Sequence, residues 1–253
     1  NWKCIEAASA AIEKVEYPAQ TAGKLKMPAT VAAEAPDFIK NVTAKMIAQK
    51  GNELPVSAIP DDGTWPTATT QWEKRNVAAF IPAWDPAACI QCGQCSIICP
   101  HAAIRMKVYD EDKLAGAPAT FKSADSKTPK MKALGAKVTV QVAPEDCMGC
   151  ELCVVKCPMA AKGALKMVEQ IPLRKTEAAN WKFFLDLPEV DAAKLDTKQV
   201  LDSQLKRPLF EFSGACAGCG ETPYVKLLTQ ICGDRLLIAN ATGCSSIYGG
   251  NLP

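Results

Sequence analysis

Short apolar runs recur along the middle of the chain, and their length and spacing predict strands. The runs lie at 77–82, 104–109, 138–142 and 164–171. Apolar runs of this length, bounded by turn-forming residues, are typical of β-strands. Four strands this short cannot form a hydrophobic core by themselves.

Helical periodicity is found toward the two ends of the chain. The stretches predicted to be helical are 3–17, 36–50, 191–205 and 223–232. Pro223 suits the first turn of the last helix and Gly233 its end, which leaves Glu221 just outside the N-terminus. A buried strand is predicted to follow at 235–239 and to lead into a loop of small residues that contains Cys244.

Two long segments interrupt these elements. The first, 51–76, is rich in Pro and Gly, and we expect an ordered loop or arm over another surface because Trp65 and Trp72 argue against disorder. The second, 110–137, is polar and is predicted to be an insertion loop on the surface.

The overall charge and hydropathy exclude several kinds of partner. The 29 Lys plus Arg against 27 Asp plus Glu give a net charge of +2, so no strong field attracts nucleic acid or an anionic membrane. No apolar stretch approaches the roughly 18 residues that span a bilayer, and the start of the chain lacks a secretory pattern. We therefore expect a soluble cytoplasmic protein with no nucleic-acid or membrane partner. The ends at Asn1 and Pro253 indicate a piece of a larger protein.

Cysteine usage points to metal. The chain holds 13 cysteines, an odd number in a long chain, which disfavours a secreted disulfide framework. Most of them form two copies of C-x2-C-x2-C-x3-C-P, a run typical of two-cluster bacterial ferredoxins in which the fourth cysteine binds the other cluster. The predicted ligands are Cys89, Cys92, Cys95 and Cys157 for cluster 1, and Cys147, Cys150, Cys153 and Cys99 for cluster 2. Two zinc sites are the less favoured alternative.

A third group of cysteines is less specific. Cys216, Cys219 and Cys244 suggest a third cluster whose fourth ligand lies outside the chain. Taken alone, the C-x-x-C pair also fits a thioredoxin-like redox pair or half a zinc site. Cys4 and Cys232 are expected to have packing roles.

The arrangement of motifs closely resembles pyruvate:ferredoxin oxidoreductase of the single-chain bacterial type. The resemblance rests on the segment from GNELPVSAIP to CIQCGQCSIICPHAAIR, the second cysteine motif, and then FSGACAGCGETPYVKLL and NATGCSSIYGG. It implies an α+β ferredoxin-like two-cluster domain followed by the beginning of an α/β thiamine diphosphate-binding domain. The implied boundaries are the end of a preceding domain at 1–30, a connecting arm at 31–72, the ferredoxin-like domain at 73–188 and the thiamine diphosphate domain from 189 to 253.

The resemblance also implies an activity. An enzyme of this family decarboxylates pyruvate on thiamine diphosphate with Mg²⁺, passes electrons singly through three [4Fe-4S] clusters and forms acetyl-CoA. The implied partners are pyruvate, CoA, ferredoxin or flavodoxin as acceptor, and a second copy of the enzyme as homodimer. Cys216, Cys219 and Cys244 would ligate the cluster nearest thiamine, and Glu221 and Cys244 would contact thiamine. The remaining cofactor and substrate contacts are absent, so this piece alone is expected to be inactive.

Two further features and two alternative functions accompany this interpretation. His101 is expected to pack or to hydrogen-bond sulfur rather than transfer protons. The basic residues of 101–137 are expected to be solvated, with a docking surface for an acidic ferredoxin as the sharper hypothesis. The alternative functions are another 2-oxoacid:ferredoxin oxidoreductase and a non-catalytic electron-transfer module.

Overall fold

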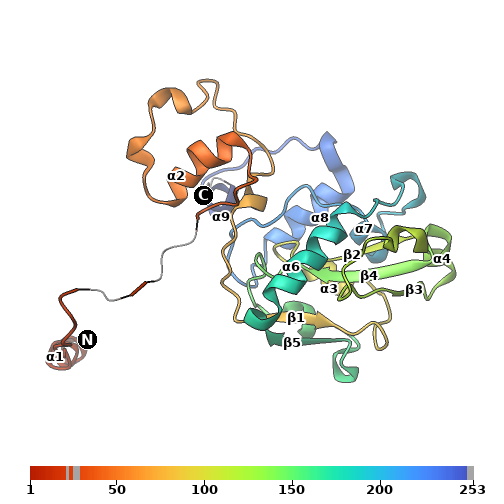
Figure 1. Ribbon diagram of the computed structural model, residues 1–253, viewed down its shortest axis with the longest axis horizontal. Helices are drawn as coiled ribbons and strands as arrows, with labels where there is room; N and C mark the ends of the chain where they lie inside the picture. Colours follow the sequence, from red (N-terminus) through yellow and green to blue (C-terminus); the bar gives the residue numbers. More distant parts are fainter. Residues whose placement is uncertain (21–22, 25–28, 250–253) are drawn as a thin grey trace.

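The computed structural model describes residues 1–20, 23–24 and 29–249 (Figure 1). Its α-helices are α1 (Trp2–Ala10), α2 (Ala44–Ile47), α3 (Gln94–Ile98), α4 (Pro129–Leu134), α5 (Leu152–Val155), α6 (Gln170–Asp186), α7 (Val200–Gln204), α8 (Thr222–Cys232) and α9 (Cys244–Gly249). Its strands are β1 (Phe80–Trp84), β2 (Ile104–Tyr109), β3 (Ala124–Asp125), β4 (Lys137–Val142) and β5 (Leu165–Glu169). The four predicted strands are therefore confirmed, with shifts of a few residues at their ends.

The centre of the fold uses one structural unit twice: a strand, a cysteine loop, a short helix and a second strand. The first unit is β1, α3 and β2, and the second is β4, α5 and β5. β1 pairs antiparallel with β5, and β2 pairs antiparallel with β4. The first strand of each unit therefore pairs with the last strand of the other, and α3 packs against α5. This confirms the predicted ferredoxin-like part of the fold.

Strand β2 is buried along its whole length, although it contains two basic residues. Successive side chains of a strand point to opposite faces, so Arg105 and Lys107 lie on the face opposite Met106. The Arg105 guanidinium lies 4.8 Å from the centre of the Trp181 ring, and Lys107 Nζ lies 5.1 Å from that of Phe184. Helix α6, which crosses the β2–β4 sheet in Figure 1, thus covers this face through cation–aromatic contacts.

The sequence pattern did not predict helix α6. The strand expected at 164–171 ends at Glu169, and Ile171 is 77% exposed. Pro172 in the first turn, with Trp181 and Phe184 on one stripe, carried the helical signal. The signal was weak because the same stripe contains the buried Asn180, which is hydrogen-bonded to Thr120 at 3.0 Å.

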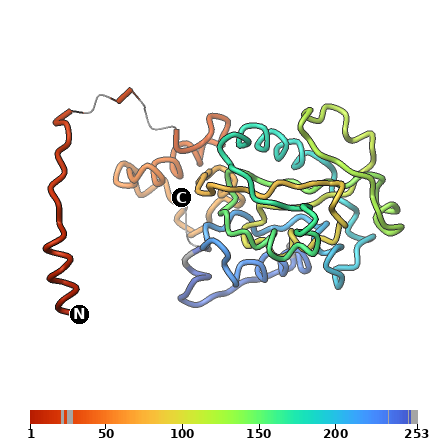
Figure 2. The backbone as a smooth tube through the Cα atoms, turned by 90° about the horizontal axis from the view of Figure 1, so that it is seen from below, coloured from red at the N-terminus to blue at the C-terminus, as the bar shows by residue number. Residues whose placement is uncertain are grey.

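The N-terminal elements are shorter than predicted. α1 ends at Ala10 rather than at 17, and none of its residues is buried. It lies apart from the rest of the chain in both views (Figures 1 and 2). The second predicted helix is present, but a π-helical turn at Ile39–Thr43 precedes α2 and the helix stops before residue 50. No described helix is both long enough and apolar enough to cross a bilayer.

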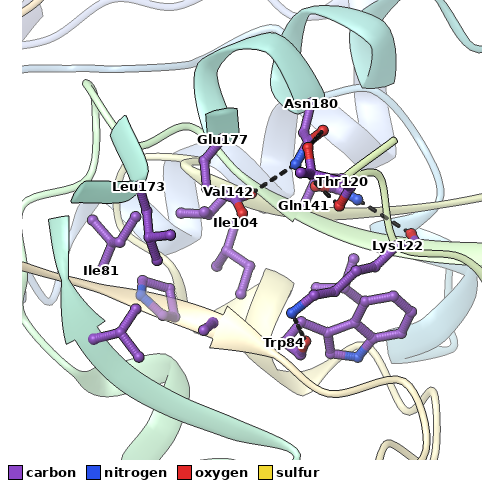
Figure 3. A pocket seen from close by; sticks show the side chains of 14 residues that line it. Ile81, Trp84, Ile104, Thr120, Lys122, Gln141, Val142, Leu173, Glu177 and Asn180 are labelled. Atoms are coloured by element: carbon purple, nitrogen blue, oxygen red, sulfur yellow. Dashed lines mark hydrogen bonds between the residues drawn. The ribbon is translucent and has the colours of Figure 1, made fainter. Parts of the chain in front are cut away.

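Residues 110–137 are not a simple surface insertion, so this prediction was wrong. β3 adds a third strand to β2 and β4, and Met131 of α4 is fully buried. Lys122 Nζ donates a hydrogen bond to the Trp84 carbonyl at 2.8 Å, as Figure 3 shows. The polar composition conceals the buried role of this segment, because hydrogen bonds attach it together with a few apolar residues such as Met131.

The expected α/β start of a thiamine diphosphate domain is only partly visible. Helix α8 is confirmed, but 235–239 forms no strand, and Leu237 is 97% exposed. Neither sheet in the described part of the chain extends to this segment. A strand obtains its hydrogen bonds from neighbouring strands, so the apolar run alone cannot form one. The helix predicted at 191–205 is also shortened, to α7 and a 3₁₀ turn at Ala192–Lys194.

Gly135 permits the close approach of α4 to β2 and provides a stability test. A Cβ atom at this position would lie 2.8 Å from backbone atoms of Tyr109. We expect Gly135→Ala to cost about 1–3 kcal/mol because the strand backbone must move. The apparent thermal midpoint should then fall by several degrees, since about 1 kcal/mol corresponds to about 2–4 °C in a protein of this size. Gly51→Ala is the matched control, because a Cβ there meets nothing within 4 Å. Equal midpoints for the two variants would contradict the proposed packing.

Candidate iron–sulfur centres

The two cysteine loops share one backbone device. Gln91 and Gly93 in the first loop have φ angles of 62° and 77°, and Gly149 and Glu151 at the equivalent positions of the second have 69° and 64°. Each loop therefore needs two left-handed residues, of which only one is glycine. These turns curve each loop around a central space and direct its cysteines inward.

The first cavity combines cysteines of both motifs. It has a volume of about 380 Å³, part of it open to solvent, and contains Cys89, Cys92, Cys95 and Cys157 in its lining. Met106 and Leu165 form part of its apolar wall. The structure thus brings together the residues predicted to ligate cluster 1, including the one from the second motif.

The second cavity mirrors the first. It has a volume of about 370 Å³, again partly open, and is lined by Cys147, Cys150, Cys153 and Cys99. His101 also reaches this cavity. The exchange of one cysteine between the motifs follows directly from the crossed pairing of the strands.

The cysteines are arranged around spaces rather than around a point. A zinc ion with Zn–S bonds of about 2.3 Å would require sulfur atoms only about 3.8 Å apart. Among the described residues, no three Cys, His, Asp or Glu side chains converge closely enough to hold one metal ion. The four cysteines that line each cavity are the number of thiolates that hold a [4Fe-4S] cube.

The environment of the cysteines opposes free thiolates. Burial, followed by the neighbouring Cys89, Cys92 and Cys157, raises the pKa of Cys95 to about 12. Burial likewise raises the pKa of Cys147 to about 12. Negative sulfur is therefore costly here without a compensating positive charge, which iron supplies when it replaces the protons.

A segment far along the chain holds the first loop in its strained conformation. The Gln91 side chain is 2% exposed and donates to the Asp125 carbonyl at 2.8 Å. Its Oε1 accepts from the Lys127 backbone N–H at 2.8 Å, and Lys127 Nζ donates to the Cys89 carbonyl. These bonds offset the cost of a positive φ angle at Gln91.

Helix α8 is packed with its polar face inward. Thr222, Lys226 and Gln230 are buried, whereas Tyr224 and Leu228 are exposed. Lys226 Nζ donates to the carbonyls of three residues at the end of α3, namely Ser96, Ile97 and Cys99. Burial lowers the pKa of Lys226 to about 8. Sequence periodicity missed this role because it assigns the apolar side of a helix to the core.

The third group of cysteines is only partly assembled. Cys219 Sγ accepts from the Glu221 N–H at 3.4 Å. Burial, then Glu221, then Cys219 and Cys244, raise the pKa of Tyr248, which places these groups around one tyrosine of α9. Cys216 and Cys244 are exposed, and Cys244 begins α9 rather than lying in a loop. Partial burial raises the pKa of Cys219, but backbone N–H groups of Thr222 and Glu221 outweigh it and lower the pKa overall.

The third group lies next to the second cavity. A Cβ atom on Gly218 would lie 3.7 Å from Cβ of Cys150. His101 Nε2 lies 3.2 Å from the Cys216 carbonyl oxygen, which can only accept, so this nitrogen carries the proton. His101 is 3% exposed, and its pKa is lowered chiefly by burial. The packing role expected for His101 thus includes a hydrogen bond that connects the end of the first cysteine motif to Cys216 of the third.

The basic residues of 101–137, predicted to be solvated or to dock ferredoxin, are divided between the interior and the surface. Arg105 pairs with Glu211 at 2.8 Å and Lys107 with Glu189 at 2.8 Å. Residues 101–137 contain eight Lys or Arg. Those with a charged or carbonyl partner among the described residues are Arg105, Lys107, Lys113, Lys122, Lys127, Lys130 and Lys137. Lys113, Lys127, Lys130 and Lys132 are exposed, as the solvated interpretation expects. Cys4 is exposed, so its expected packing role was wrong, while Cys232 is half-buried.

An ion pair attaches the end of the Pro- and Gly-rich arm at 51–76 to the second loop. Lys74 Nζ lies 2.6 Å from Oδ2 of Asp146, whose side chain is 2% exposed and which precedes Cys147. Burial raises the pKa of Asp146 to about 6, although Lys74 acts in the opposite direction. Lys74 is the cation that pairs with this buried carboxyl group. The Asn76 N–H adds a bond to the Glu145 carbonyl at 3.0 Å.

Comparison with known families agrees with this geometry. Residues 88–161 match the 4Fe-4S dicluster domain, and residues 24–78 match EKR, described as a domain of unknown function. The crossed strands and cysteine-lined cavities thus define a dicluster iron–sulfur protein. In one-letter code, Glu73, Lys74 and Arg75 read EKR, which is the name of the second domain. Lys74 is the residue that pairs with Asp146.

Longer relatives identify the family. A putative pyruvate-flavodoxin oxidoreductase of Synechocystis is 53% identical over 100% of this chain and 21% of its own length. A probable pyruvate-flavodoxin oxidoreductase of Escherichia coli is 51% identical over 100% of the chain and 22% of its own length. Pyruvate:ferredoxin oxidoreductase of Moorella thermoacetica is 49% identical, with shares of 100% and 21%. The chain belongs to the pyruvate-flavodoxin/ferredoxin oxidoreductase family and spans about a fifth of these relatives.

The Lys74–Asp146 pair predicts a stability effect. Lys74→Met leaves a buried carboxylate unpaired and should destabilise the protein by about 1–3 kcal/mol, less than for a fully buried pair because Lys74 is partly exposed. Asp146→Asn combined with Lys74→Met should recover part of this loss. The apparent thermal midpoint of the cluster-loaded protein measures both effects.

Lys14→Met is the control, because the Lys14–Glu16 pair is 83% exposed on both sides and should contribute little. A midpoint for Lys74→Met equal to that of Lys14→Met would show that the arm is not attached through this pair.

Proposed function

We propose that this chain is the electron-transfer part of an enzyme that oxidises pyruvate. The observation that carries the proposal is the lining of the two cavities, each with three cysteines of one motif and the fourth of the other. Cys89, Cys92, Cys95 and Cys157 would hold cluster 1, and Cys147, Cys150, Cys153 and Cys99 cluster 2. When bound, [4Fe-4S] clusters accept and release electrons one at a time. The protein binds them, surrounds them with apolar side chains and fixes their spacing.

A third cluster is part of the proposal. Cys216, Cys219 and Cys244 would supply three of its ligands, and the fourth would come from outside this chain. Thiamine diphosphate with Mg²⁺ would lie against Glu221 and Cys244. The grouping of Glu221, Cys219 and Cys244 around Tyr248 supports a shared site. The residues that complete the thiamine site are not in this chain, so it should have no turnover alone.

The packing suggests an order for the three sites. Gly218 of the third motif packs on Cys150, which lines the second cavity. Helix α3 then contains Cys95 of the first cavity and ends beside Cys99 of the second. Electrons would therefore pass from the third site through the second to the first. Ile90 lines the first cavity and is 46% exposed, so transfer to an acceptor would take place on this side.

The names of the relatives support pyruvate as a substrate and flavodoxin or ferredoxin as an acceptor. We infer pyruvate and CoA as substrates, flavodoxin or ferredoxin as acceptor, a homodimer and a cytoplasmic location. We also infer the division into 1–30, 31–72, 73–188 and 189–253. The last segment would open the thiamine diphosphate domain.

The exchange of cysteines between motifs can be tested by ligand substitution. If Cys157 ligates the same cluster as Cys89, then Cys157→Ser and Cys89→Ser should lose the same cluster, whereas Cys153→Ser should lose the other. Electron paramagnetic resonance of the reduced, anaerobically prepared protein distinguishes the remaining signals, and iron content should fall by about four atoms in each variant. Cys4→Ser should retain both clusters. A Cys157→Ser spectrum that matches Cys153→Ser would contradict the exchange.

The proposed function predicts reduction by substrate. In the complete protein, pyruvate with CoA should reduce the clusters under anaerobic conditions, as followed by optical bleaching. Cys219→Ser should reduce this reaction to background because the first acceptor is lost, while dithionite should still reduce clusters 1 and 2. Cys232→Ser is the control and should react like the natural protein. Reduction by pyruvate at an unchanged rate in Cys219→Ser would exclude a relay through the third site.

A further inference from the structure

Lys226 is a buried cation with an unusual position. It is 1% exposed and lies in the middle of α8, the helix that directly follows the third cysteine motif. No carboxylate forms an ion pair with it within the described part of the chain. Its partners are backbone carbonyls, with Nζ at 3.1 Å from the Ile97 oxygen and 3.0 Å from the Cys99 oxygen. The third acceptor is the Ser96 carbonyl.

These three bonds use all the hydrogens of an ammonium group. A neutral amine has only two N–H groups, so three carbonyl acceptors favour the charged form. The carbonyls belong to the end of α3, which carries the negative end of the helix dipole. The charge is thus held by dipoles and is not cancelled by an anion.

A buried network keeps Lys226 in place. Ser96 Oγ donates to Gln204 Oε1 at 3.0 Å, and Gln204 Nε2 donates to Gln230 Oε1 at 3.0 Å. Gln230 lies one turn after Lys226 on α8, and its amide donates to the Lys206 carbonyl at 2.8 Å. Helices α3, α7 and α8 are therefore joined by satisfied polar groups, which makes the position of the ammonium specific.

The ammonium lies beside both cysteine sites. Cys95, within α3, lines the first cavity, and Cys99, just after α3, lines the second. The ionisable groups that act most on Lys226 are Cys99, Arg105 and Cys95. Addition of an electron makes an iron–sulfur cluster one unit more negative, and a nearby buried positive charge stabilises that state more than an exposed one does.

We propose that Lys226 is a positioning residue whose uncancelled charge raises the reduction potentials of the two clusters at α3 and so favours electron entry from the third site. This inference rests on the proposed function, because it requires [4Fe-4S] clusters in both cavities. A purely structural role, as a cap of α3, would keep the same hydrogen bonds without dependence on charge.

The test is a potentiometric titration of the complete, cluster-loaded protein, followed by electron paramagnetic resonance. Lys226→Met and Lys226→Gln both remove the charge, while Lys226→Gln retains a donor to the carbonyls. At a fixed potential, we expect the ratio of reduced to oxidised cluster to fall about tenfold in both, a shift of about 59 mV toward negative values for a one-electron couple. Lys226→Arg should stay near the natural value.

Lys132→Met is the matched control, because Lys132 is exposed and its substitution changes the net charge equally. If Lys226→Met or Lys226→Gln keeps its iron and sulfide content and has the reduction potentials of the natural protein, the proposal is overturned. Lys226 would then be a structural cap of α3. Loss of clusters in all three Lys226 variants would also overturn the proposal. Lys226→Arg keeps the positive charge, so its failure would show that the charge alone does not account for the role of Lys226. Absence of [4Fe-4S] signals in the natural protein would instead refute the proposed function.

Discussion

Antiparallel pairing between the two halves of the central domain determines where each cysteine of the two motifs lies. β1 pairs with β5 and β2 with β4, so each cysteine loop begins on one sheet and its chain continues into the other. The cysteine before proline therefore leaves its own loop and reaches the opposite cavity. The crossed strands and the shared cavities are thus one feature, because each half supplies three cysteines to one cavity and its fourth to the other.

Several cations lie in or at the edge of the interior around the cysteine cavities, and each has carboxylate, carbonyl or aromatic partners. Arg105 and Lys107 lie on the outer face of β2, where Trp181 and Phe184 of α6 cover them. Lys226 approaches from α8, and Lys74 joins the arm to Asp146 beside Cys147. Charged side chains of this kind normally lie on the protein surface, where water solvates them. Here, their ion pairs and hydrogen bonds replace the apolar contacts that a domain with two large polar centres cannot provide.

The sequence was most informative where chemistry fixes the spacing. The cysteine runs predicted which residues gather in each cavity, and short apolar runs predicted all four main strands. It was less informative where burial is polar: α6 contains Asn180, the segment around Lys122 attaches through hydrogen bonds, and α8 turns Lys226 inward. Periodicity assigns apolar residues to the interior, so it cannot predict a helix whose charged residue is the buried one. Whether such a polar residue is buried depends on its hydrogen-bonding partner, and that partner is distant in the chain.

The disagreement at 235–239 has a different origin. The apolar residues of this run are correct for an interior strand of an α/β sheet, but a strand is stable only beside another strand. The described residues provide none, and Leu237 and Ile238 are exposed, as are Tyr224 and Leu228 of the preceding helix. The apolar run at 235–239 therefore has no strand neighbour among the described residues, whereas the cysteine domain contains both members of each strand pair that it needs.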